Sequence, residues 1–394
     1  MGFGQGLSGL KGAAQKLDVI GNNIANAGTV GFKSATVSFA DVYASSRVGL
    51  GTQVASVNQN FTTGVVANTG NQFDMAIDGG TGMFRVVDTN GNVLYTRNGE
   101  FSADKNGYIV NAQGYRLTGF EGDSTTPTPI RVPSGNIAPQ ATTLVQTMPN
   151  LNAGETAITP VAVPDPIDPS TYHNSLSMTV YDSQGGAHQL TQYFVKVNDD
   201  DNEWNVYYQM GNDAVMTTPH TLTFDGQGVL ATGQTYPDFE LIPEGATEAL
   251  EVTINYAGAT QYEGEFSYNF DQDGYYTGEY SSMSIGRNGE IMAAYTNGES
   301  QQVGFLVLAN FNNLQGLQPV GGNAWRETSE SGQPILGTPG TNGMALIKGQ
   351  AVEESNVDMG TELVNMIITQ RVYQANAQTI TTQSEMMQTL INMR

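Results

Sequence analysis

The residues of this sequence that could carry out chemistry are few and widely spaced. The 394-residue chain has no cysteine, which excludes disulfides, thiolate zinc sites and cysteine nucleophiles. Its three histidines, His173, His188 and His220, stand at no spacing typical of metal ligands. We therefore expect surface histidines and predict no metal site.

Two acidic segments imitate cation sites. Residues 269–274, Asn-Phe-Asp-Gln-Asp-Gly, match the opening of a calcium-binding loop. The bidentate acid should then stand at Tyr280, but the nearest acid is Glu279, one residue early. We expect a β turn there. At residues 199–201, three consecutive aspartates predict an acidic turn that is at best a weak cation site.

Local motifs of catalysis are missing from the sequence. There is no Gly-Lys-Ser/Thr phosphate loop and no Gly-x-Ser-x-Gly nucleophile elbow. Paired carboxylates for glycoside hydrolysis remain open in so acidic a chain, although no local motif points to them. We predict that the protein is not an enzyme and uses no cofactor.

The charge of the chain is strongly negative and unevenly distributed. The formal net charge is −23, which argues against nucleic acid or an anionic membrane surface as a partner. Residues 146–284 hold twenty acidic residues and one basic residue, Lys196, a net −19. No stretch is apolar enough to span a bilayer, and no basic segment followed by an apolar run predicts a signal peptide.

The elements that must organise the chain are its two ends. From residue 355 onward, apolar residues alternate at spacings of three and four, which predicts a long helix with a narrow heptad seam. Ser355 reads as its cap, and from Asp358 the helix would be about 55 Å long. The seam positions are Leu363, Met366, Gln370, Tyr373, Ala377, Ile380, Ser384, Met387 and Ile391.

The start of the chain repeats the same rhythm at Leu7, Leu10, Ala14, Leu17, Gly21 and Ile24. These could be two ordinary core helices, but both seams are narrow, so we favour a coiled coil between the chain ends. The glycines of the first segment would make it marginal as an isolated helix. We predict that both seams serve self-assembly, since a single small domain cannot cover them.

Between the helices the pattern is that of β structure. Residues 29–70 predict an extended linker with short strands. Residues 71–145 and 285–354 contain short alternating runs joined by Asn-Gly pairs, which favour type I′ hairpins. These pairs are Asn90-Gly91, Asn98-Gly99, Asn106-Gly107, Asn288-Gly289 and Asn297-Gly298.

The order of these segments predicts an α+β multidomain protein. A terminal helical coiled coil (residues 1–28 and 355–394) carries two mainly antiparallel β domains. The first β domain is 71–145 with 285–354, and an acidic outer β domain, 146–284, is inserted into it. The chain would run out and back.

Three segments carry a resemblance to a known family. Residues 22–33, Asn-Asn-Ile-Ala-Asn-Ala-Gly-Thr-Val-Gly-Phe-Lys, resemble the N-terminal signature of the bacterial flagellar rod and hook family. Residues 355–358 and 366–376 resemble its C-terminal signature, and residues 73–79 and 95–101 its shared β region. The motif positions are Asn22, Asn23, Asn26, Thr29, Gly31, Phe32, Lys33, Gln370, Arg371 and Asn376.

The resemblance implies a function outside the cell, in the hook and basal body of the flagellum. The long insertion favours the hook member of the family over the distal-rod member. It implies a structural subunit of a curved, flexible helical tube that transmits motor torque as a universal joint. The partners it implies are further copies of the chain, the distal-rod protein, the hook–filament junction protein, the hook cap, the hook-length control protein and the type III export apparatus. The alternatives are a distal-rod subunit or a secreted adhesive or carbohydrate-active β protein.

Overall fold

The computed structural model describes residues 3–42, 49–122, 124–160, 162–198, 202–241 and 249–392. The chain forms two compact units. Unit 1 is Met1–Ser134, Ser282–Ala294 and Ser300–Arg394, and unit 2 is Gly135–Ser281 with Tyr295–Glu299. The chain leaves unit 1 at 134, where the sequence pattern had placed the boundary at 146.

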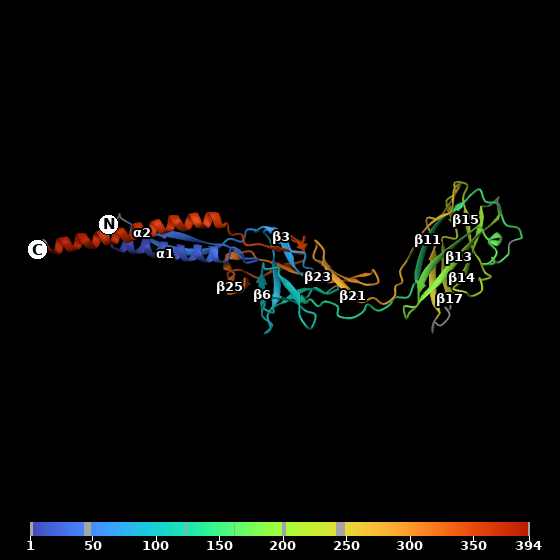
Figure 1. The fold of residues 1–394 in the computed structure, drawn as a ribbon, viewed down its shortest axis with the longest axis horizontal. Helices are drawn as coiled ribbons and strands as arrows, with labels where there is room; N and C mark the ends of the chain where they lie inside the picture. The colour runs from blue at the N-terminus through green and yellow to red at the C-terminus, as the bar shows by residue number, and fades with distance from the viewer. Residues whose placement is uncertain are drawn as a thin grey trace. The chain divides into compact units, whose positions relative to one another are not determined.

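Two helices from the ends of the chain lie side by side in unit 1 (Figure 1). They are α1 (Phe3–Ala25) and α2 (Met359–Asn392). The residue that caps α2 is Asp358, whose side chain accepts hydrogen bonds from the backbone N–H groups of Gly360 (2.8 Å) and Thr361 (3.1 Å). The predicted cap, Ser355, lies outside the helix and accepts from the N–H of Val357 instead.

A long antiparallel hairpin occupies much of the predicted linker. Strands β1 (Ala35–Asp41) and β2 (Thr52–Gln59) pair with each other alone and contact α1. A Cβ at Gly12 of α1 would lie 3.0 Å from the Phe39 ring. The sequence pattern predicted short strands in this segment but not that they pair into one hairpin.

The first β domain is built on one large sheet. The strand order is β21-β22-β23-β9-β5-β6-β26-β25, with β7, β8, β10, β24 and β27 attached at its margins. Its strands are β5 (Met83–Val87), β6 (Val93–Thr96), β7 (Phe101–Ala103), β8 (Ile109–Asn111), β9 (Arg116–Phe120), β10 (Thr128–Pro129), β21 (Tyr280–Ile285), β22 (Glu290–Tyr295), β23 (Ser300–Leu306), β24 (Leu308–Asn310), β25 (Gln318–Gly321), β26 (Ala324–Arg326) and β27 (Ile335–Gly337), with a short 3-10 helix at Leu314–Gly316.

The outgoing and returning segments of the chain pair directly in unit 1. Strand β3 (Val66–Asn68) pairs with β29 (Ala351–Glu353), and β4 (Met75–Asp78) pairs with β28 (Leu346–Gly349), both antiparallel. Met75, Ala76 and Ile77 of β4 are fully buried. These pairs hold the segment that leads into α2 beside the segment that follows α1.

The hairpin turns differ from the type I′ turns expected at the Asn-Gly pairs. Only the glycine has a positive φ, as at Gly91 (88°) and Gly107 (82°), which is the pattern of a longer loop closed by a glycine bulge. The side chain of Asp88, two residues before Asn90, accepts the N–H groups that close one such loop. Gly99 does not have a positive φ, and a Cβ there would strike the Met75 carbonyl.

Unit 2 packs two five-stranded sheets around one core. Trp204, Tyr208 and Tyr256 are its largest fully buried side chains. One sheet is β12 (Asn174–Tyr181), β13 (Ala187–Asn198), β14 (Glu203–Met210), β15 (His220–Phe224) and β16 (Leu230–Thr232). The other is β17 (Thr235–Leu241), β18 (Leu250–Asn255), β11 (Leu144–Asn152), β19 (Thr260–Tyr262) and β20 (Ser267–Gln272), with a 3-10 turn at Pro169–Thr171 elsewhere in the unit.

Candidate functional site

A buried ion cluster joins the bases of the two terminal helices to the β domain. The Lys33 ammonium lies 2.5 Å from Oε1 of Glu353, and the Arg97 guanidinium lies 2.9 Å from Oε2 of the same carboxylate. Lys33 also donates to the Thr62 carbonyl (2.7 Å), and Arg97 to the Gly79 carbonyl (3.0 Å). Burial lowers the pKa of both Lys33 and Arg97, and Glu353 opposes that shift for each.

Two asparagines complete this junction. The buried Asn23 side chain exchanges two 2.9 Å hydrogen bonds with the backbone of Ala35 and donates to the Glu362 carboxylate of α2 at 3.2 Å. Asn356 accepts from the N–H of Ser34 (2.8 Å) and donates to the carbonyl of Asn60 (2.8 Å). We name Asn23, Lys33, Arg97, Glu353 and Asn356 the junction cluster.

The predicted motif residues divide into two groups. Position 31 requires glycine, because its φ is 70° and a Cβ there would lie 2.5 Å from the Asn98 nitrogen. Asn26 donates to Asn22 and accepts from Thr29, which closes the end of α1. Phe32 is half-buried near the junction cluster. Gln370, Arg371 and Asn376 lie on α2, the first two exposed and the third half-buried.

The contact between α1 and α2 is made by small and polar residues. A Cβ at Gly6 would lie 3.1 Å from Ile380, and one at Gly9 would lie 2.8 Å from the Asn376 amide. Together with the Asn23–Glu362 hydrogen bond, these contacts show that the helices run antiparallel. The glycines predicted to weaken α1 are therefore what allows close approach to α2.

The predicted apolar seams account for only part of the contact between α1 and α2. Of the seam residues, Leu10, Ala14, Leu17, Gly21, Ile24, Met366, Ala377 and Ile380 are half-buried. The exposed ones are Leu7, Leu363, Gln370, Tyr373, Ser384, Met387 and Ile391. The pattern predicted the heptad rhythm, but the face of α2 that meets α1 also includes Glu362 and Asn376, which lie outside the predicted seam, beside the seam residue Ile380.

Helix α2 consequently exposes a large amount of apolar surface. The described part of α1 begins at Phe3, so the last turns of α2 have no described α1 residue beside them (Figure 1). The exposed large apolar side chains of α2 are Met359, Leu363, Val364, Ile367, Ile368, Val372, Tyr373, Met386, Met387 and Ile391. Isolated exposed apolar residues are common on proteins, but a contiguous set marks an interaction surface.

A groove of about 450 Å³ lies between α1, α2 and the β1–β2 hairpin. Its walls include Ile368 and Val372 of α2 and Phe39 of β1, all exposed. Gly9 and Ala13 of α1 form part of its floor. Three separate elements therefore present apolar side chains to one hollow.

The three histidines each make a contact within unit 2. All three are half-buried. His173 contacts the Thr156 carbonyl (3.0 Å), His188 pairs with Asp182 (2.8 Å), and His220 contacts the Gly233 carbonyl (2.8 Å). Among the described residues, no three potential ligands are grouped so that they could hold a metal ion.

The calcium-like segment is part of a strand. Residues 269–272 belong to β20, so the expected β turn is wrong. Asp273 accepts from the N–H groups of Thr143 (2.8 Å) and Leu144 (2.9 Å), which fixes the start of β11 and holds the pKa of Asp273 below its ordinary value despite partial burial. The aspartates at 199–201 lie outside the described residues.

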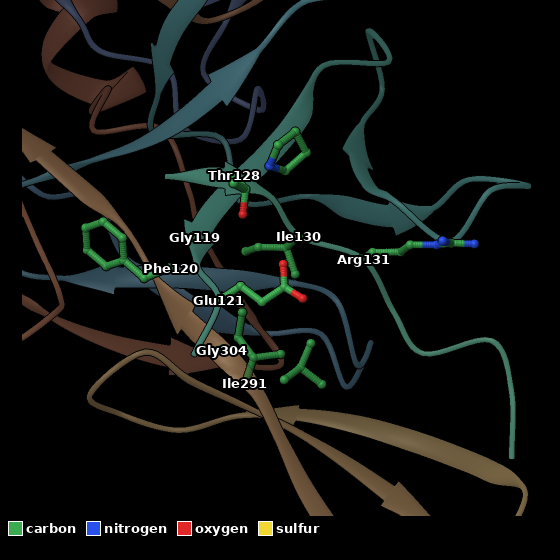
Figure 2. A pocket seen from close by; sticks show the side chains of 10 residues that line it. Gly119, Phe120, Glu121, Thr128, Ile130, Arg131, Ile291 and Gly304 are labelled. Atoms are coloured by element: carbon green, nitrogen blue, oxygen red, sulfur yellow. The ribbon is translucent and has the colours of Figure 1, made fainter. Parts of the chain in front are cut away.

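A small hollow lies on the large sheet of unit 1. Figure 2 shows the Glu121 carboxylate reaching between Ile130 and Ile291, with the Arg131 side chain directed away. Its volume is about 40 Å³. The hollow is therefore much smaller than the groove beside β1.

Three members of the junction cluster, Arg97, Glu353 and Asn356, were not predicted as site residues. Arg97 and Asn356 lie inside the segments that carried the family resemblance, and this position was the one feature of the sequence that could have pointed to them. Glu353 lies just before such a segment. A pair 320 residues apart in sequence leaves no local spacing to detect.

No helix among the described residues is long and apolar enough to cross a membrane.

Comparison with known proteins gives matches along the whole chain. The family models that match are the flagella basal body rod protein (residues 5–33), the flagellar hook protein FlgE/F/G D1 domain (76–150), the flagellar basal body protein FlaE D2 domain (150–275) and the flagellar basal body rod FlgEFG protein C-terminal region (348–393).

Full-length relatives agree with these models. The flagellar hook protein FlgE of Salmonella typhimurium is 43% identical over 411 residues, and that of Escherichia coli 42% identical over 410, each covering 100% of both chains. The hook protein FlgE2 of Helicobacter pylori has a similar fold, with a TM-score of 0.54 and 17% identity over 73% of this chain and 100% of that one.

Proposed function

This chain belongs to the flagellar hook protein FlgE family and is a structural subunit of the flagellar hook, and we propose that its terminal helices make the contacts between copies. The protein is an exported component of the flagellum. The observation that supports the proposal is the apolar surface left exposed on α2.

The energy of burying this surface is large enough to drive assembly. Burying one large apolar side chain is worth about 1.5–3 kcal/mol, so burial of most of these exposed residues can exceed the roughly 4–15 kcal/mol that association costs. The groove beside β1 lies on one side of α2, whereas the exposed Ile367 lies on another face of the helix. A contact between different faces of identical subunits need not close into a ring and builds an open helical polymer.

The finer roles follow from this proposal. We expect the paired helices to form the inner layers of a curved, flexible tube and the β domains its outer shell, where subunits slide as the tube transmits torque. We expect the distal-rod protein and the hook–filament junction protein at its two ends, with the cap, the length-control protein and the type III export apparatus acting during growth. The subunit acts as a building element and not as an enzyme.

A paired substitution on α2 tests the proposal. Val364→Ser with Ile367→Ser should leave the free monomer within about 0.5 kcal/mol of its parent, because both positions are exposed. The concentration needed for polymer formation should rise by about tenfold or more. Sedimentation and negative-stain microscopy of the full chain measure this. Thr382→Ser, an exposed polar change on the same helix, is the control. Assembly of the double variant at the parent's concentration would refute the proposal.

A further inference from the structure

The methionines of this chain lie in two kinds of environment. Several methionines of the β domains are buried, such as Met75 (0% exposed) and Met283 (1% exposed). Three methionines of α2 are open to solvent, with Met359 50%, Met386 56% and Met387 51% exposed. Because exposure decides how readily a thioether is oxidised, the two groups differ in chemistry as well as in position.

Met386 and Met387 lie in the part of α2 that the described residues of α1 do not cover (Figure 1). Gly6 of α1 lies against Ile380 of α2, and the two helices run antiparallel. The described start of α1, Phe3, therefore stops short of both methionines. Consecutive residues of a helix point about 100° apart, so the two thioethers open to different sides of α2. A molecule that packs around this end of the helix covers at least one of them.

The face of α2 around Met386 offers few other groups to an oxidant. Met386 lines a hollow of about 480 Å³ together with Ala375, Thr379 and Thr382. The hydroxyls of Thr379 and Thr382 donate to the backbone carbonyls of Ala375 and Gln378 at 2.9 Å, so each hydroxyl proton is satisfied within the helix. Among the residues that line this hollow, Met386 carries the one sulfur atom.

Oxidation of a thioether by hydrogen peroxide is a balanced two-electron step. The sulfur attacks one peroxide oxygen, an S–O bond forms, the O–O bond breaks and water leaves. The methionine loses two electrons and the peroxide gains them. The product, methionine sulfoxide, is polar and chiral where the thioether was apolar and flexible. Burying such a polar group without a hydrogen-bond partner is unfavourable.

We propose that Met386 and Met387 form an oxidation site that stops the free subunit from assembling. This inference rests on the proposed function, in which the exposed apolar side chains of α2 become buried against neighbouring copies. A sulfoxide at either position places a polar oxygen in that contact. The polymer shields the site once a subunit has joined it, so hydrogen peroxide acts on subunits that are still free.

Mass spectrometry of the full-length free subunit tests the site itself. The protein is held below the concentration at which it assembles, treated with dilute hydrogen peroxide and digested with trypsin. Cleavage after Arg371 leaves Met386 and Met387 in one peptide, and fragmentation of that peptide locates the added oxygen. We expect both residues to oxidise at least about tenfold faster than the buried Met75 and Met283. Equal rates at the exposed and buried positions would overturn the inference.

Leucine variants test the consequence for assembly. Leucine has nearly the volume of methionine and cannot form a sulfoxide. Met386→Leu with Met387→Leu should assemble like the parent before peroxide treatment and should still do so afterwards. For the treated parent, the concentration needed for polymer formation should rise by about tenfold or more. A treated parent that assembles at its original concentration would refute the inference.

Met359, at the other end of α2, provides the matched control because its side chain is as exposed as that of Met387. Met359→Leu keeps both Met386 and Met387, so peroxide should impair its assembly as much as that of the parent. If Met359→Leu protects assembly as well as the double variant does, the sensitive position lies elsewhere and the assignment is wrong.

Enzymatic reduction gives a further readout and separates this inference from the proposed function. Methionine sulfoxide reductases, one for each sulfoxide epimer, should restore assembly of the oxidised parent. Assembly that stays blocked after the sulfoxides have been reduced would show that other damage is responsible, and would overturn the inference. The substitutions at Val364 and Ile367 test the proposed function without any oxidant, so their result is independent of the peroxide experiment.

Discussion

The Nζ atom of Lys33 and the Oε1 atom of Glu353 lie 2.5 Å apart, although 320 residues separate them in sequence. Neither side chain is exposed to solvent. Lys33 follows α1 and Glu353 ends the strand that precedes α2, so this ion pair fixes the bases of both helices at one point. The junction therefore fixes how both helices leave the β domain of unit 1.

Glu353→Gln should destabilise unit 1 by about 3–5 kcal/mol, because Lys33 and Arg97 would remain buried without their shared carboxylate. Urea unfolding followed by the fluorescence of Trp325, which lies in unit 1, measures the loss. Glu354→Gln alters the exposed neighbouring carboxylate and should change stability by less than about 0.5 kcal/mol. Similar shifts in the two variants would contradict a special role for the buried carboxylate.

Replacing either of two N-terminal glycines by alanine should change the free energy of unfolding, in opposite directions for the two positions. Gly31→Ala forces a Cβ onto a residue with φ of 70° and into the backbone around Asn98, at a cost of about 2 kcal/mol or more. Gly21 lies in α1 with open space around it, and Gly21→Ala should stabilise the helix by about 1 kcal/mol. Thermal unfolding of the two variants tests the pair, and a shift of the same sign in both would show that the assigned environments are wrong.

Unit 2 should lose stability in alkali. Burial raises the pKa of both Tyr208 and Tyr256 above the ordinary value of 10.0. The unfolded chain then releases these protons first, so stability is constant at neutral pH and falls as pH rises past about 10. At pH 11 each tyrosine should account for a loss of about 1.4 kcal/mol.

Urea unfolding followed at Trp204, between pH 7 and pH 11, measures this loss, since Trp204 lies in the core of unit 2. Tyr208→Phe removes the outer member of the chain in which Tyr208 contacts Tyr256 and Tyr256 donates to Gln192. The Tyr208→Phe variant should therefore lose roughly half as much stability between pH 7 and pH 11 as the parent protein. An unchanged pH profile in this variant would show that other groups cause it.

The terminal helices and the mainly β interior could be predicted from the sequence, because both depend on local signals. The heptad spacing that includes Met366 and Ile380 indicates a helix whatever the rest of the chain does. Repeated glycine turns such as Asn106-Gly107 indicate hairpins in the same way. The face that pairs the helices could not be predicted in this way. It depends on how closely Gly6 and Gly9 let α2 approach, and a search for apolar residues passes over glycine.

The junction cluster illustrates the same limit. Lys33 was noted for its place in a family signature, but its partners Glu353 and Arg97 come from two other parts of the chain. Only the pairing of β3 with β29 and of β4 with β28 brings those parts together. Contacts that depend on long-range strand pairing leave no periodic trace in the sequence.

The strand pairs between the outgoing and returning segments make the protein modular. Both helices and the junction cluster belong to unit 1, and they come from segments before residue 135 and after residue 299. The segment that forms unit 2 can therefore change in length or sequence without moving the helices or the junction cluster. A foreign domain whose ends lie close together could be grafted in its place, which would turn the filament wall into a scaffold for display.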